Sequence, residues 1–353
     1  MGLASKTRDV VGMIKDRVSQ SKAAILSKPS NLSLHLALLR ATTHDPFSPA
    51  DNKHIDTILS FGHSSRATAA IAIEVVMDRL QRTRDSSVAL KCLLIVHHVV
   101  KHGDFILLDQ LSVRPFTGGR NYLNLSNFRD NSSPVTWELS SWVRWYAQYI
   151  ETILSTSRVL GYFFASSSCS IDKDKQEEKI SALTNSYLLI QIVSLVGLVE
   201  EICKRPDSLH VEGNKLVNQI MGIVVEDHFS AISEVSVRVS EFRERLSGLS
   251  FGESVELVCT LRRLENCKER LFELSSSKGA MMESFWGFIS EIKNGVGTEK
   301  DEGKLVITVR RGKAGESSDS GRFMHDLHDS DLLKFSDDRI VLGTLLESTK
   351  RKI

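Results

Sequence analysis

The sequence predicts an all-α protein, an irregular stack of about ten helices followed by a disordered C-terminal tail. Two observations support this fold class. Apolar residues recur at helical spacings up to about residue 293, and no convincing strand alternation occurs before residue 304. From about residue 295 onward Gly, Ser, Asp and Lys dominate. We therefore expect a helical domain over residues 1–294 and a flexible tail over residues 295–353.

Helical segments follow one another along the chain, each with apolar residues three and four positions apart. The stretch 86–101 is apolar almost throughout, which predicts a central position in the stack. Residues 166–179 join a serine-rich run to a charged run, which is typical of an exposed loop. The expected segments are 5–26, 32–42, 50–61, 65–83, 86–101, 104–112, 136–154, 158–165, 180–204, 208–229, 230–246, 252–274 and 277–293.

Composition is that of an ordinary globular protein, with 41% apolar and 25% charged residues. The net charge of +1 provides no overall attraction to nucleic acid, so an anion site must come from local clustering. Five cysteines without CxxC spacing favour buried free thiols, and with no long apolar run or signal peptide we expect a cytoplasmic protein. Residues 1–40 supply a cluster of cations against two acids: Lys6, Arg8, Lys15, Arg17, Lys22, Lys28 and Arg40 against Asp9 and Asp16.

The segment from Arg40 to His54 is the most informative part of the sequence. Arg40 is followed by Ala-Thr-Thr-His, a turn bracketed by two prolines, and then Lys53 and His54 where a helix is expected to restart. Backbone N–H groups at a helix start, flanked by cations, favour a phosphorylated ligand. Because no Gly-rich nucleotide loop is present, the phosphate is expected to belong to a lipid headgroup or another surface ligand.

Four elements, in this order, resemble the ANTH domain of clathrin assembly proteins of the synaptic and plant type. The first is the segment Arg40–His54, and the second is the Ala-Leu-Lys-Cys-Leu-Leu-Ile-Val-His-His run that ends at His98. The third contains Leu-Ser-Asn-Phe-Arg-Asp and ends at Asp130, and the fourth is Trp-Val-Arg-Trp-Tyr-Ala-Gln-Tyr, ending at Tyr149. The resemblance is close over residues 5–165 and looser to about residue 293.

The resemblance implies a superhelical solenoid of α-helices that acts as an endocytic adaptor and not as an enzyme, without a cofactor. Arg40, Lys53 and His54 match three basic positions of the family's phosphoinositide site. The implied ligand is phosphatidylinositol 4,5-bisphosphate in the cytosolic leaflet. Clathrin or a clathrin adaptor, and an R-SNARE cargo, are the implied partners. The implied location is peripheral, on clathrin-coated pits and vesicles of the plasma membrane, with the Golgi as a further membrane, and the chain is most similar to the plant branch.

The chain departs from the family pattern just before Lys53. The family usually places two or three lysines there, whereas this chain has Ala50, Asp51 and Asn52. Losing one lysine and gaining an acid would weaken lipid affinity roughly ten- to thirtyfold. An alternative is that Asp51 caps the next helix and that the protein is a helical interaction scaffold with reduced or lost lipid binding. The N-terminal helix also has two interpretations, an interfacial helix on the membrane or the first helix of the stack.

The tail contains one candidate binding motif, Asp331-Leu332-Leu333, set between acidic residues and Phe335. Asp-Leu-Leu is a clathrin- and adaptor-binding signal in endocytic proteins, and the surrounding apolar residues could fold on a partner as a short amphipathic helix. His98 and His102 have the spacing of metal ligands on a helix, but no third ligand is evident, so we expect structural histidines and no metal site. The sequence contains no catalytic constellation.

Overall fold

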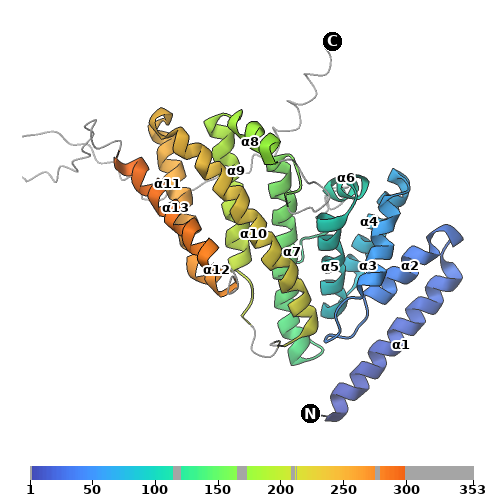
Figure 1. Cartoon of the computed structure of the whole chain (residues 1–353). Helices are drawn as coiled ribbons and strands as arrows, with labels where there is room; N and C mark the ends of the chain where they lie inside the picture. Colours follow the sequence, from blue (N-terminus) through green and yellow to red (C-terminus); the bar gives the residue numbers. More distant parts are fainter. Residues whose placement is uncertain are drawn as a thin grey trace, which may run out of the picture. The chain divides into compact units, whose positions relative to one another are not determined.

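The computed structural model of this chain describes residues 2–113, 121–164, 173–207, 211, 213–274 and 279–298. Within these residues the structure is entirely helical (Figure 1). The α-helices are α1 (Gly2–Leu26), α2 (Pro29–Ala41), α3 (Asn52–Leu59), α4 (Arg66–Arg82), α5 (Ser86–His102), α6 (Phe105–Val113), α7 (Pro134–Leu160), α8 (Lys173–Ser181), α9 (Asn185–Cys203), α10 (Lys215–Glu244), α11 (Phe251–Glu265), α12 (Lys268–Leu274) and α13 (Gly279–Thr298). Two short 3-10 helices, Ser60–Gly62 and Leu246–Gly248, join them. The all-α prediction is confirmed.

Several helix boundaries differ from those expected. α7 runs through the join expected after residue 154 and α10 through the join expected after residue 229, since no Gly or Pro lies at either join. The helix expected over 158–165 is wrong beyond Leu160, where α7 ends. Local signals instead fix the ends of α7: a capping box between Ser133 and Thr136 starts it, and Gly161, with φ of 81°, ends it. The charged run that was expected to be a loop forms α8, because Lys, Gln and Glu are good helix formers.

Helix α5 lies at the centre of its neighbours, as its apolar sequence predicts. It packs against α3, α4, α6 and α7, and every residue of α5 except His98 and His102 is buried. From α7 the stack continues to α9, which packs against α10 and α11, and α13 packs against both of these. Helix α9 is long and apolar enough to cross a membrane by length and composition, but more than half of it is buried, as in the core helix of a stack.

A buried polar network ties α5, α7 and α10 together. The carboxylate of Asp227 lies 2.5 Å from Nε2 of His97, and it accepts hydrogen bonds from Tyr149 at 2.8 Å and from Lys101 at 3.0 Å. The other ring nitrogen of His97 lies 2.9 Å from the hydroxyl of Tyr146. Burial alone would raise the pKa of Asp227, but the charge and hydrogen bond of His97, together with Lys101, outweigh burial and lower that pKa.

The cysteines only partly follow expectation. Cys92 and Cys267 are buried free thiols, and Cys203 is half-buried. Cys259 is exposed, so the prediction of a buried thiol is wrong there: the buried leucines of α11, Leu257, Leu261 and Leu264, lie on another face of the helix. Cys169 lies outside the described residues.

Candidate functional site

The candidate site centres on the loop between α2 and α3, which begins with the Thr-Thr-His motif. Thr42 is fully buried. Its hydroxyl donates to the carbonyl of Leu38 at 2.6 Å, and its own carbonyl accepts from a terminal guanidinium nitrogen of Arg79 at 2.8 Å. The Nε–H of Arg79 donates to the Thr42 hydroxyl at 2.5 Å. Thr42 therefore joins the end of α2 to α4 and is not available to a ligand.

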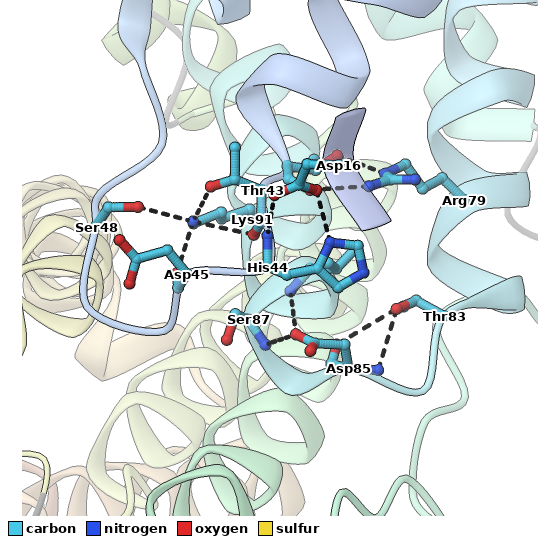
Figure 2. Close-up of polar contacts among 12 residues, drawn as sticks. Asp16, Thr43, His44, Asp45, Ser48, Arg79, Thr83, Asp85, Ser87 and Lys91 are labelled. Atoms are coloured by element: carbon cyan, nitrogen blue, oxygen red, sulfur yellow. Dashed lines mark hydrogen bonds and ion pairs between the residues drawn. The ribbon is translucent and has the colours of Figure 1, made fainter. Parts of the chain in front are cut away.

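Lys91 of α5 holds the middle of the loop. Its side chain is buried, and its ammonium lies within hydrogen-bonding distance of four oxygens: Thr43 O (3.1 Å), Thr43 Oγ1 (2.7 Å), Asp45 O (2.9 Å) and Ser48 Oγ (3.2 Å). Figure 2 shows this ammonium among Thr43, Asp45 and Ser48. Burial lowers the pKa of Lys91 to about 8, against a partial opposing effect of Asp45.

His44 fastens α1 to the same loop. Asp16 of α1 accepts a hydrogen bond from the backbone N–H of His44 at 3.1 Å, and its second oxygen lies 2.6 Å from Nδ1 of the ring (Figure 2). Gly12, one helical turn before Asp16, lies against the same residue: a Cβ at this position would come within 3.2 Å of the His44 Cβ. The absence of a side chain at Gly12 thus permits the close approach of α1 to His44.

The residues that replace the expected lysines have structural contacts. Ala50 is buried, and its backbone exchanges two hydrogen bonds with the side-chain amide of Gln219 on α10, at 2.9 and 3.1 Å. The same amide reaches the side-chain oxygen of Asn52 at 3.3 Å. Asp51 is the N-cap of α3 and accepts the backbone N–H of Lys53 at 2.9 Å. The helix cap that the alternative interpretation expects is confirmed.

The three predicted phosphoinositide residues lie on two helices that pack against each other, α2 and α3. Arg40 is exposed in the last turn of α2, and Lys53 is exposed in the first turn of α3. His54 is mostly covered, and its Nε2 lies 3.6 Å from the carboxylate of Asp51. Within the described part of the chain, neither the side chain of Arg40 nor that of Lys53 has a hydrogen-bond or ion-pair partner. The first-turn N–H groups of Lys53, His54 and Ile55 already bond to Asp51, so the helix start offers fewer free donors than expected.

Comparison with known proteins gives the family of this fold. The sequence profile of the ANTH domain matches residues 33–276. The chain belongs to the ANTH domain family. An Arabidopsis thaliana relative that bears the name "Putative clathrin assembly protein" is 52% identical over 330 residues, covering 92% of this chain and 90% of its own length. Two others from the same organism, with the same name, are each 32% identical and cover 85% and 80% of this chain and 88% and 97% of their own lengths.

Helix α1 precedes the segment matched by the ANTH profile, and its large apolar side chains from Val10 onward are exposed. Val10, Ile14, Val18 and Ile25 are 48%, 55%, 60% and 81% exposed, and their spacings of four and seven place them on one helix face. Gly12 and Asp16, which contact His44, lie on a different face. α1 packs on α2 through one face, as expected for the first helix of the stack. It also leaves an apolar face uncovered, as an interfacial helix would.

The sequence analysis did not identify the residues that hold the loop between α2 and α3 in this ANTH domain. Lys91, Asp16 and Gln219 all contact it, from α5, α1 and α10. The one available signal was Lys91, a single lysine inside an apolar run, which indicates a buried and therefore partnered ammonium. The predicted tail motif, Asp331-Leu332-Leu333, lies outside the described residues.

The histidines of α5 have other contacts than the metal-ligand spacing suggests. His98 and His102 lie with ring centroids 5.7 Å apart, and burial lowers the pKa of His98 to about 4. The ring nitrogen Nε2 of His98 has no hydrogen-bond partner among the described residues, so the expected hydrogen bonds of a structural histidine are made by His97 and not by His98. In the same part of the chain, no group of three or more His, Cys, Asp and Glu residues could hold a metal ion.

ANTH domain clathrin assembly proteins are non-enzymatic adaptors.

Proposed function

We propose that this protein is an adaptor of clathrin-coated membranes that docks on phosphatidylinositol 4,5-bisphosphate in the cytosolic leaflet, chiefly of the plasma membrane and also of the Golgi. The observation that carries the proposal is the uncovered apolar face of α1, flanked by exposed Lys15, Arg17 and Lys22. None of these three cations has a partner among the described residues. An apolar face bordered by unpaired cations is the pattern of a helix that lies in the interface of an anionic membrane.

The magnitudes require both parts of this surface. A fully buried Val or Ile side chain contributes about 1.5–3 kcal/mol, but the side chains of α1 are partly covered already and an interfacial helix buries only one face. Each basic residue near an anionic surface adds about 1 kcal/mol. Apolar contact or charge alone would therefore give weak and reversible binding, whereas the two together are sufficient for stable docking.

The Arg40–Lys53–His54 corner is the proposed headgroup contact of the same docking surface. The side chains of Arg40 and Lys53 are exposed and have no partner within the described residues, as a phosphate contact requires. Asp51 lies beside them and occupies the N–H of Lys53. We therefore expect the corner to bind a headgroup more weakly than a site with lysines at all three preceding positions.

The proposed division of labour places membrane docking on the helical domain, residues 1–294, and partner recruitment on the tail, residues 295–353. Asp331, Leu332 and Leu333 are the proposed clathrin or adaptor motif. The relatives' shared name, with its reference to clathrin assembly, supports this partner. An R-SNARE cargo would dock on the helical domain, and nucleic acid is not an expected partner. No cofactor is required for any of these contacts.

A second candidate function is a helical interaction scaffold with reduced or lost lipid binding. The specific observation in its favour is the use of Ala50, Asp51 and Asn52 as structural residues: they attach the loop to Gln219 and cap α3. No free lysine precedes Lys53 in this turn. The scaffold would keep the fold and the tail motif while its contacts with membranes become weak.

Vesicle sedimentation separates the two functions. Vesicles with phosphatidylinositol 4,5-bisphosphate should bind the wild type, and vesicles with unphosphorylated phosphatidylinositol should bind it less. Lys53→Glu should lower binding to the phosphorylated vesicles about tenfold or more, because it reverses a charge at the proposed headgroup contact. Arg262→Glu is the matched control, since Arg262 is exposed on α11 and has no partner among the described residues. Equal binding of wild type and Lys53→Glu would exclude the corner, and no binding by the wild type would favour the scaffold.

Pull-down with clathrin and with adaptor fragments tests the tail. Truncation after residue 298 keeps all of α13 and should leave the helical domain folded. The double change Leu332→Ala with Leu333→Ala in the full chain should remove most of the binding, as groove-bound leucines contribute about 1.5–3 kcal/mol each. A matched control is Leu345→Ala with Leu346→Ala, a second leucine pair in the same tail. Undiminished pull-down by the Leu332→Ala, Leu333→Ala variant would place the partner elsewhere on the chain.

A further inference from the structure

A cavity of about 600 Å³ opens between α1, α2, α4 and the segment that leads into α5. Four cations line it, one from α1 and three from the end of α4 and the residues after it: Lys15, Arg79, Arg82 and Arg84. Two acids line it as well, Asp78 and Asp85. Arg40, Lys53 and His54 are not among its lining residues, so this basic groove is separate from the corner between α2 and α3.

The acids of the basic groove are already engaged. Asp85 is the N-cap of α5 and accepts the backbone N–H groups of Ser87 and Val88 at 2.9 and 3.2 Å. Asp78 pairs with Arg82 at 3.0 Å on the exposed side of α4. The lining of the groove therefore has four cations and two carboxylates, which leaves an excess of positive charge.

Two cations of the basic groove remain free to bind a ligand. Lys15 and Arg84 are exposed and have no hydrogen-bond or ion-pair partner in the described part of the chain. Arg79 is oriented by its two hydrogen bonds to Thr42, and Thr83 and Asp85 lie with it around the ring of His44 in Figure 2. An oriented guanidinium together with two exposed, unpartnered cations in one cavity suits an anion with several charged groups.

The lining selects among polyanions. The volume is in the range of small-molecule sites, about 300–1,000 Å³, which excludes a long nucleic-acid strand. Apolar side chains of Leu38, Leu39, Val75 and Val88 line the cavity beside the cations, and the lining contains no Phe, Tyr or Trp on which a base could stack. A compact saturated ring with several phosphates matches this combination better than a nucleotide does.

We propose that the basic groove binds a phosphorylated inositol, as a second site beside the Arg40–Lys53–His54 corner. The class of ligand, a phosphorylated inositol, rests on the proposed function. The site is new, because the groove is separate from the corner between α2 and α3. The ligand could be the headgroup of a membrane lipid or a soluble inositol phosphate, which present the same phosphates. A bound ligand would bridge Lys15 on α1 to Arg84 before α5, and so would hold α1 in place together with the Asp16–His44 pair.

The test compares the wild type with one full-length double variant, the groove variant, which carries both Lys15→Glu and Arg84→Glu. Soluble inositol hexakisphosphate, titrated by calorimetry, is the first probe, and vesicles with phosphatidylinositol 4,5-bisphosphate are the second. The variant should lose about tenfold or more in affinity for the soluble probe, because two cations become acids. The matched control is Lys215→Glu with Arg262→Glu, which makes the same change of net charge at two exposed residues away from the groove and should retain wild-type affinity.

The two probes distinguish the sources of the ligand. A loss with the soluble probe alone assigns the groove to a free inositol phosphate, and a loss with both assigns it to either source. If the wild type binds only vesicles, a loss there in Arg84→Glu alone, which leaves the cations of α1 in place, but not in Arg262→Glu, supports the lipid headgroup. Failure of the wild type to bind vesicles would remove the proposed function yet leave the groove standing if soluble binding depends on Lys15 and Arg84.

The groove proposal is overturned if the wild type binds neither probe, or if the groove variant matches the wild type with every probe that binds. A melting curve checks that the variant folds, which we expect because both side chains are exposed. Should the double variant unfold, Arg84→Ala alone makes the same comparison, with Arg262→Ala as its control.

Discussion

Helices α1 and α5 both carry apolar and basic residues, yet the structure uses them in opposite ways. In α5 every residue except His98 and His102 is buried, including Lys91, His97 and Lys101. In α1 the apolar side chains from Val10 to Leu26 are exposed. The difference teaches that an apolar residue indicates burial only where the fold provides neighbours on its side of the helix.

The basic residues of the two helices differ in the same way. Those of α5 are partnered inside the protein: Lys91 holds the loop after α2, and Lys101 pairs with Asp227. Lys15 and Lys22 of α1 have no partner among the described residues. Buried cations must be paired because desolvation is costly, whereas exposed cations remain hydrated without a partner and are accessible to a ligand. Structural roles therefore concentrate on α5, and the proposed binding roles on α1.

The largest effect on stability should come from the carboxylate at the end of the α5 network. Asp227→Ala removes the common partner of His97, Lys101 and Tyr149, and leaves their polar groups buried. The free energy of unfolding should fall by about 3–5 kcal/mol, measured by urea denaturation at pH 7. Asp56→Ala, an exposed acid of α3, should change it by less than about 0.5 kcal/mol. A loss of under 1 kcal/mol in Asp227→Ala would show that the network is not needed for stability.

The same network predicts acid sensitivity. Because the pKa of Asp227 is lowered in the folded state, its contribution is present above the carboxyl's ordinary value and is lost as pH falls through the folded pKa. The difference in unfolding free energy between wild type and Asp227→Ala should therefore be constant near neutral pH and shrink below about pH 4.

A smaller loss should follow the removal of the ammonium that holds the loop. Lys91→Met keeps a long apolar stem but leaves Thr43 and Asp45 carbonyls without their donor. We expect a loss of about 2 kcal/mol at pH 7 and faster amide hydrogen exchange in residues 43–48. Lys215→Met, on an exposed lysine, is the control and should be nearly neutral. Unchanged exchange in the loop would contradict the holding role of Lys91.

The Lys91 ammonium also predicts a pH dependence, of the same sign as that of Asp227 but in the alkaline range. Burial lowers its pKa from 10.5 to about 8, so between these values the unfolded chain binds more protons than the folded chain. The contribution of this group to stability therefore rises with pH across that window, and below pH 8 the cost of burying the charge is present in full. Melting temperatures of the wild type should rise relative to those of Lys91→Met between pH 8 and 9.5.

The smallest effect on stability is expected on α1. Ile14→Ser with Val18→Ser alters two exposed side chains, so the unfolding free energy should change by less than about 1 kcal/mol in total. Binding to vesicles that contain phosphatidylinositol 4,5-bisphosphate should nevertheless fall about tenfold or more, as the apolar contact is lost. Ile190→Ser with Val255→Ser, two exposed residues of α9 and α11, is the control. If only the stability of the α1 variant falls, the apolar face of α1 is part of the fold and not a docking surface.

The sequence was sufficient for the fold class and for the centre of the stack. Helical spacing of apolar residues identifies most helices, and the apolar run over 86–101 correctly predicts the burial of α5. Helix boundaries were predicted wrongly in α7 and α10, where the sequence was divided into two segments although no Gly or Pro lies at the join. Capping residues such as Ser133 and Asp51 are local signals that the sequence does contain.

The contacts that shape the candidate sites were decided by tertiary structure. Lys91 meets Thr43, and Gln219 meets Ala50, across 48 and 169 positions of the chain. No local pattern encodes such pairs, since they depend on how helices distant in sequence pack against one another. The sequence by itself determined the residue types at the corner, Arg40, Lys53 and His54. Only the packing of α1 and α10 on that loop decided that Asp16 and Gln219 are tied to it and that a separate basic groove lies beside α4.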